Sequence, residues 1–167
     1  RDSILAASGR LDLSQGGAFP FPHWKHGVFN LNRPFKADYP SDRRSVYLMT
    51  QRLFRNPFFA LFDGPDRNQS TATRNASTLP TQALYLMNSP FVEDQAGAFA
   101  DRVASRAADR STAIELAYQF AYGRFPAADE ARAMELYLAR LENQLIDLGA
   151  TPAHEVRHQS WVAVAKA

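Results

Sequence analysis

Hydrophobic positions recur at helical spacing along the second half of the chain. Apolar side chains three and four residues apart share one face of a helix. One such face consists of Met134, Leu138, Leu141, Leu145 and Leu148, and Gly149 is placed to end that helix. The pattern predicts a helix in each of five segments, which are residues 80–88, 89–108, 111–123, 128–149 and 151–167.

The helix expected over residues 111–123 carries two apolar stripes. The first stripe consists of Ile114, Ala117, Tyr118, Ala121 and Tyr122. Leu116 and Phe120 add a second stripe on another side. We therefore predict that this helix is buried on most sides and ends at Gly123.

The first half of the chain has a different pattern, because Gly and Pro interrupt it repeatedly. Residues 1–8 read as a helix and residues 43–54 as one extended, strand-like segment. Asn56 as N-cap and Pro57 at the first helical position predict a short helix over residues 56–62. Long irregular segments inside a compact domain are uncommon and tend to be functional.

These patterns predict a mostly α fold. An irregular wrap, residues 1–79, rich in aromatic residues, Pro and Gly, is expected to pack on a C-terminal helical bundle, residues 80–167. We expect one domain over residues 1–167, a fragment of a longer protein whose last helix is truncated. No apolar run approaches the roughly 20 residues that a membrane-spanning helix needs, so no membrane span is expected.

The charge is uneven along the chain. Residues 1–62 carry nine Lys or Arg and four Asp or Glu, and 11 of the 20 aromatic residues lie between Phe19 and Phe62. A basic, aromatic-rich segment is one footprint of single-stranded nucleic acid binding. The basic residues are scattered and the net charge is only +2, so we favour rings that cover a helical core and expect no nucleic acid partner. The absence of cysteine excludes disulfides and thiolate metal sites in this chain.

Residues 62–75, FDGPDRNQSTATRN, hold the densest group of candidate site residues. An EF-hand counted from Asp66 fails, because position 6 is Thr71 instead of Gly and position 12 is Ser77 instead of Glu. Asp63 and Asp66 form a candidate acid and base pair if burial separates their pKa values. The alternative is a structural clasp in which an Asp pairs with Arg74 while amide and hydroxyl side chains bond the backbone. The candidate binding or clasp residues are Asp63, Asp66, Asn68, Arg74, Thr78, Gln82 and Asn88.

The four histidines are weak candidates for a metal site. His23 and His26 lie three residues apart among prolines, with no third ligand close in sequence. In HEVRH, the residues His154, Glu155 and His158 satisfy the H-E-x-x-H pattern of zinc proteases. A third ligand would have to come from elsewhere, so we favour a solvated helix face and expect no metal.

Several stretches together resemble one family. They are RDSILAASGRLDLSQGG, RRSVYL, FDGPDRNQSTATRNASTLPTQALYLMNSPFV, AYQFAYGRFPAADE and WVAVAKA. This set is similar to a secreted domain of unknown function found in planctomycetes and their relatives. That domain lies at the C-terminal end of large exported proteins that also carry planctomycete cytochrome c domains. The positions that match its motif are Asp63, Pro65, Asp66, Asn68, Arg74, Thr78, Pro80, Gln82, Asn88 and Pro90.

The resemblance implies an exported protein, periplasmic or associated with the cell envelope. It implies c-type haem on a separate domain of the parent protein, no cofactor in this chain, and no established activity. The chain departs from the motif at Ala76 and Ser77, where a Thr pair is more usual. The family also continues past the last residues of this chain.

Three functional hypotheses remain open. The first is a non-catalytic binding or assembly module of a larger exported, haem-associated protein, with other domains of that protein and an extracellular polymer as partners. The second is a hydrolase of an extracellular polymer such as a polysaccharide, with Asp63 or Asp66 as acid or base. The third is a zinc hydrolase that uses the HEVRH run.

Overall fold

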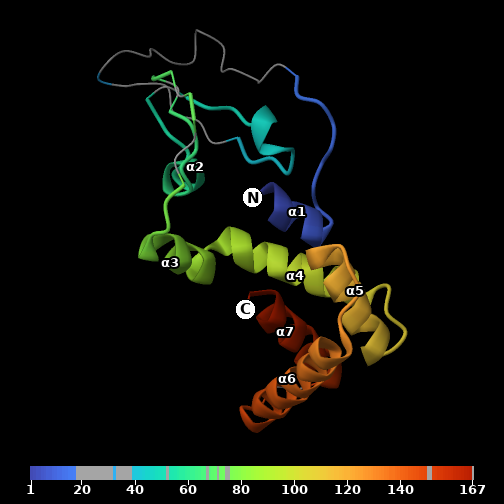
Figure 1. The fold of residues 1–167 in the computed structure, drawn as a ribbon. Helices are drawn as coiled ribbons and strands as arrows, with labels where there is room; N and C mark the ends of the chain where they lie inside the picture. Colours follow the sequence, from blue (N-terminus) through green and yellow to red (C-terminus); the bar gives the residue numbers. More distant parts are fainter. Residues whose placement is uncertain are drawn as a thin grey trace. The chain divides into compact units, whose positions relative to one another are not determined.

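A computed structural model describes residues 1–17, 32, 39–51, 53–66, 68–70, 72–73, 76–149 and 152–166. The chain divides into two compact units. The first unit contains Arg1–Leu11 and Leu86–Ala167, and the second contains Asp12–Tyr85. The predicted mostly α fold is confirmed, and no β-strand forms within the described ranges (Figure 1).

The first unit is a helical bundle with its own hydrophobic core. Its helices are α1 (Asp2–Ser8), α4 (Pro90–Ala104), α5 (Arg110–Tyr122), α6 (Ala128–Asp147) and α7 (Ala153–Lys166). Helix α4 packs against α1, α5 and α7, and α6 packs against both α5 and α7. The core is made of Phe99, Ala100, Val103, Ala113, Ile114, Ala117, Leu138 and Trp161.

Local capping explains where these helices begin and end. The Asp109 carboxylate accepts a hydrogen bond from the Thr112 N–H at 2.8 Å at the start of α5. Gly123 ends α5 in the left-handed conformation, with φ of 68°. Helix α4 begins at Pro90, one residue after the start of the predicted segment 89–108, and the Ser89 side chain makes no capping hydrogen bond. The same helix ends at Ala104, four residues before the predicted end at residue 108.

Burial along α5 and α6 follows the predicted faces only in part. Ile114 and Ala117 are buried in the core, whereas Tyr122 is 70% exposed. Helix α5 is therefore not buried on most sides, because its C-terminal turn borders solvent. On α6, Leu138 is 1% exposed, but Leu148 is 84% exposed because α6 ends at Asp147.

Arg102 ties α1 to α4 within this unit. Its Nη1 donates to the carbonyl oxygens of Ala6 at 2.8 Å and Ala7 at 2.6 Å. These carbonyls lie in the last turn of α1, where the helix leaves carbonyls without intrahelical partners. The guanidinium also lies 3.8 Å from the centroid of the Phe120 ring. Burial lowers the pKa of Arg102, and the two carbonyls and the ring compensate for its desolvation.

The second unit contains the 3-10 helix η2 (Ser45–Tyr47), α2 (Pro57–Leu61) and most of α3 (Pro80–Asn88). The prediction for α2 is confirmed, since the Asn56 side chain accepts from the Phe58 N–H at 2.9 Å and Pro57 is the first helical residue. The predicted bounds of α3 are also confirmed.

The strand predicted over residues 43–54 is wrong. Ser45–Tyr47 instead form a 3-10 turn, in which the Tyr47 N–H donates to the Arg44 carbonyl at 2.8 Å. The nearest approach to a strand in the described part is one isolated bridge between Asp12 and Arg43. Apolar alternation yields a strand only where a partner strand pairs with it, and here none does. Within the described segments, no helix is both long and apolar enough to cross a membrane.

Candidate functional site

We call the segment between α2 and α3, residues 62–79, the motif loop. Asp63 holds this loop of the second unit closed. Its Oδ2 accepts hydrogen bonds from the Ser77 N–H at 2.7 Å and the Ser77 hydroxyl at 2.6 Å. The Asp63 backbone is left-handed, with φ of 53°, a region that Asp tolerates better than most residues. The carboxylate thus joins the end of α2 to the approach to α3, 14 residues apart.

Gln82 closes the same loop from its other side. Its Nε2 donates to the Leu61 carbonyl at 3.0 Å and lies 3.4 Å from the Ser77 hydroxyl. Its Oε1 accepts from the Leu79 N–H at 3.2 Å. One side chain therefore satisfies backbone groups at the end of α2 and at the start of α3.

Gly64 is required by close packing. A Cβ at this position would lie 2.7 Å from both the Cβ and the carbonyl oxygen of Phe59. The Gly64 N–H donates to that carbonyl at 2.6 Å, and the Arg55 guanidinium donates to the Gly64 carbonyl. Phe58 and Phe62 stack at 4.6 Å, and both meet the Tyr85 ring edge-on, so an aromatic cluster supports the loop.

Asp66 makes only a local turn. Its Oδ1 accepts from the Asn68 N–H at 2.8 Å, the pattern of an Asx turn. Arg74 lies outside the described residues, so the predicted pairing of an Asp with Arg74 stays a prediction. Thr78 is exposed at the approach to α3, and Asn88 is exposed at its last position.

These contacts bear on the hydrolase hypothesis. The Asp63 carboxylate is directed at Ser77, and the Asp66 carboxylate at Asn68. A general acid or base must reach the proton it transfers in a substrate. Each carboxylate accepts a hydrogen bond from the backbone of its own loop: Asp63 from Ser77, 14 residues away, and Asp66 from Asn68 within one turn.

The HEVRH residues lie on α7 of the first unit. His158 Nε2 lies 3.2 Å from Asp101 Oδ1, and Glu155 accepts from the Gln159 amide at 2.9 Å. His154 and His158 line a cavity of about 430 Å³, together with the ion pair between Arg110 and Glu142 at 2.5 Å. In the described part of the chain, no three His, Cys, Asp or Glu side chains gather to hold a metal ion. His23 and His26 lie outside that part.

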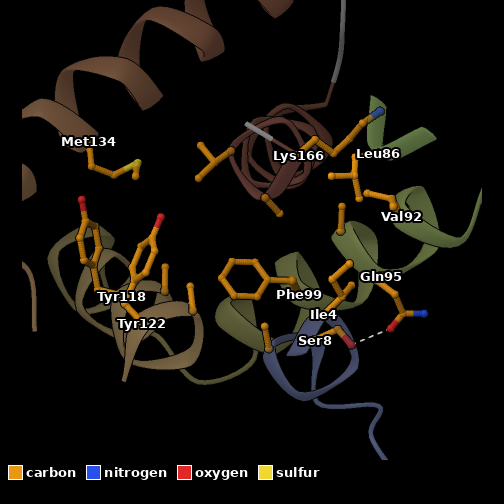
Figure 2. Close-up of a pocket in the computed structure, with 16 residues that line it drawn as sticks. Ile4, Ser8, Leu86, Val92, Gln95, Phe99, Tyr118, Tyr122, Met134 and Lys166 are labelled. Carbon is orange, nitrogen blue, oxygen red and sulfur yellow. Dashed lines mark hydrogen bonds between the residues drawn. The ribbon is translucent and has the colours of Figure 1, made fainter. Parts of the chain in front are cut away.

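A second cavity, of about 320 Å³, lies among α1, the end of α3, α4, α5, α6 and α7. We name it the apolar cavity, and Figure 2 shows the side chains that face it. Its apolar lining includes Ile4, Leu86, Val92, Phe99, Met134 and Val164. Cavities of this size with mostly apolar walls are the usual form of small-molecule sites.

Some polar side chains around the apolar cavity bond other protein groups, whereas the hydroxyls of Tyr118 and Tyr122 make no hydrogen bond within the described chain. The Ser8 hydroxyl lies 2.6 Å from Gln95 Oε1 (Figure 2) and 3.0 Å from the Leu5 carbonyl oxygen. Lys166 is paired with Glu93. Tyr118 and Tyr122 stand side by side with ring centroids 5.4 Å apart, and Figure 2 shows their hydroxyls pointing the same way. Burial is the main cause that raises the pKa of Tyr118.

Sequence reasoning missed the apolar cavity because its walls come from six helices. The one available signal was the stripe of Tyr118, Ala121 and Tyr122, which was read as core. Ala121 and Tyr122 are exposed at the cavity instead of being covered by another helix.

Comparison with known proteins identifies a family. A family model, PSD1, described as a protein of unknown function (DUF1553), matches residues 1–138. The matched region contains the whole motif loop and most of the helices that line the apolar cavity. No curated protein and no solved structure matches the chain.

Proposed function

Because the chain belongs to the PSD1 family of proteins of unknown function (DUF1553), we propose that it is a non-catalytic binding or assembly module of a larger exported protein. The proposed partners are other domains of the same parent protein, one of which carries c-type haem, and an extracellular polymer. The proposed location is the periplasm or the cell envelope. These finer points are supported by the resemblance of the motif stretches.

The observation that carries the binding role is the apolar cavity. It has the volume of a small-molecule site, and its charged neighbour Lys166 is already paired with Glu93. An apolar surface of this kind gains free energy when a ligand or a partner side chain removes it from water.

The non-catalytic part is supported by the motif loop. Asp63 and Asp66, the candidate acid and base, bond backbone groups of their own loop. Gln82 and Gly64 serve the same closure. A loop used in this way holds α2 and α3 together.

Two experiments test the proposal. A thermal-shift screen of small molecules, saccharides and peptides should find ligands that raise the melting temperature of wild type. They should have no effect on Ala121→Phe, in which a larger side chain fills the apolar cavity. A panel of polysaccharide and ester substrates should show no turnover. Hydrolysis that survives purification and disappears in Asp66→Asn would end the non-catalytic reading.

A further inference from the structure

We propose that the apolar cavity binds a small, uncharged, two-ring compound that carries a hydrogen-bond-accepting oxygen at one end, such as an aromatic ketone or quinone. This inference rests on the binding role proposed above and names the class of ligand. Three properties support this ligand class: the volume of the cavity, the pairing of the charged side chains around it, and the position of two tyrosine hydroxyls.

The volume sets the number of rings. Dry apolar cavities of about 150 Å³ hold one benzene molecule. The apolar cavity has about 320 Å³, roughly twice that volume, and is lined by Phe99 and Met134 among its larger side chains. A flat aromatic ligand packs well against a ring and a thioether, since both are polarizable. Two fused rings therefore fill the space better than one ring.

The charges around the cavity favour an uncharged ligand. Lys166 is its one charged lining residue in the described part, and its ammonium is paired with Glu93. Arg124 lies over the rings of Tyr118 and Tyr122, at 5.5 and 5.9 Å, but it donates to both oxygens of Glu130 at 2.6 Å. A charged ligand would lose hydration without gaining an unpaired counter-charge.

Tyr118 supplies the specific polar contact. Within the described chain, neither its hydroxyl nor that of Tyr122 makes a hydrogen bond to the protein, and both line the cavity. Tyr118 is half-buried, and like any tyrosine its hydroxyl is protonated at neutral pH; burial raises its pKa further. A protonated phenol donates a hydrogen bond, so the ligand atom beside it should be an acceptor. The Ser8 hydroxyl is already bonded to Gln95 Oε1, so it does not compete with the tyrosines for this role.

The test compares naphthalene with 2-acetonaphthone, which has the same two rings and an added acetyl group with an acceptor oxygen, by titration calorimetry. Wild type should bind both, and the ketone should bind more tightly. Tyr118→Phe should raise the dissociation constant of the ketone about 2- to 10-fold, which is the range of one neutral hydrogen bond. The dissociation constant of naphthalene should stay within about 2-fold of its wild-type value. Tyr137→Phe is the matched control, because Tyr137 is a partly exposed tyrosine on α6 that does not line the cavity. Ala121→Phe should abolish binding of both probes while its melting temperature shows that it folds.

The outcomes separate this inference from the proposed function. If Tyr118→Phe weakens the binding of both probes equally, the claim that the ligand places an acceptor oxygen beside Tyr118 is wrong. Failure of both probes, with other compounds that stabilise wild type but not Ala121→Phe, would overturn the ligand class and keep the binding module. If no compound of any class stabilises wild type, both proposals fail.

Discussion

Removing the Asp63 carboxylate should open the motif loop. Asp63 accepts two hydrogen bonds from Ser77, at 2.7 and 2.6 Å. A hydrogen bond to a charged group contributes about 1.5–3 kcal/mol, and half-burial places each bond at the lower end of that range. Asp63→Ala also puts Ala at φ of 53°, which costs about 1 kcal/mol. We expect Asp63→Ala to destabilise the second unit by about 3–4 kcal/mol.

Three further variants separate the contributions. Asp63→Asn keeps an acceptor and a residue that tolerates the left-handed region, so it should cost about half as much as Asp63→Ala. Adding Ser77→Ala to Asp63→Ala should cost little more than Asp63→Ala alone, because the same contact is removed. Asp66→Ala is the matched control. It loses only one turn hydrogen bond, to Asn68, and should cost about 0.5–1.5 kcal/mol.

The assay should report on the loop itself. Amide hydrogen exchange of Ser77 measures opening of the contact, and a loss of about 3 kcal/mol corresponds to roughly 100-fold faster exchange. Urea unfolding followed by circular dichroism gives the total change in free energy of unfolding. If the Ser77 amide exchanges at the wild-type rate in Asp63→Ala, and unfolding is unchanged, the clasp does not stabilise this protein.

Three other perturbations have expected outcomes. In the folded protein, a hydrogen bond from the Arg124 side chain is the main cause that lowers the pKa of Glu130 from 4.5 to about 2, and a hydrogen bond from the Ala127 backbone N–H is the second. The stabilisation from this lowered pKa is present above pH 4.5 and is lost as the pH falls toward 2. Carboxyl NMR titration should show this midpoint, and Arg124→Gln should raise it; a wild-type midpoint near 4.5 would contradict the pairing. Arg102→Leu should cost about 2–3 kcal/mol in urea unfolding, because two carbonyls of α1 lose a charged donor, and an unchanged midpoint would refute this role. Gly64→Ala should cost about 1–3 kcal/mol, because its Cβ would meet the Phe59 backbone at 2.7 Å; a variant as stable as wild type would show that the loop relaxes freely.

Helix boundaries were predicted well where a local residue determines them. Pro57 and Pro80 begin α2 and α3, and Gly123 ends α5, because their φ preferences act within one turn. The strand over residues 43–54 was wrong because strand formation depends on a distant partner. The exposure of Tyr122 was also missed, since periodicity gives the face of a helix but not how far its neighbours extend along it.

The candidate site was predicted only in part. The residues of the motif loop were identified, but Asp63 accepts two hydrogen bonds from Ser77, a departure from the usual motif that was not considered as its partner. The loop closes over 14 residues, and residue spacing does not show which hydroxyl meets a carboxylate. The apolar cavity could not be predicted, because it depends on how six helices pack.

The central claim is that ligands bind in the apolar cavity and not at the motif loop. The three methionines test it directly, because Met134 lines the cavity, Met87 is 68% exposed on α3, and Met49 belongs to the second unit. Methyl NMR of protein with labelled methionine should be recorded during titration with 2-acetonaphthone. We predict that the Met134 signal shifts and saturates while those of Met49 and Met87 stay in place. A shift of Met49 with no change at Met134 would contradict the account.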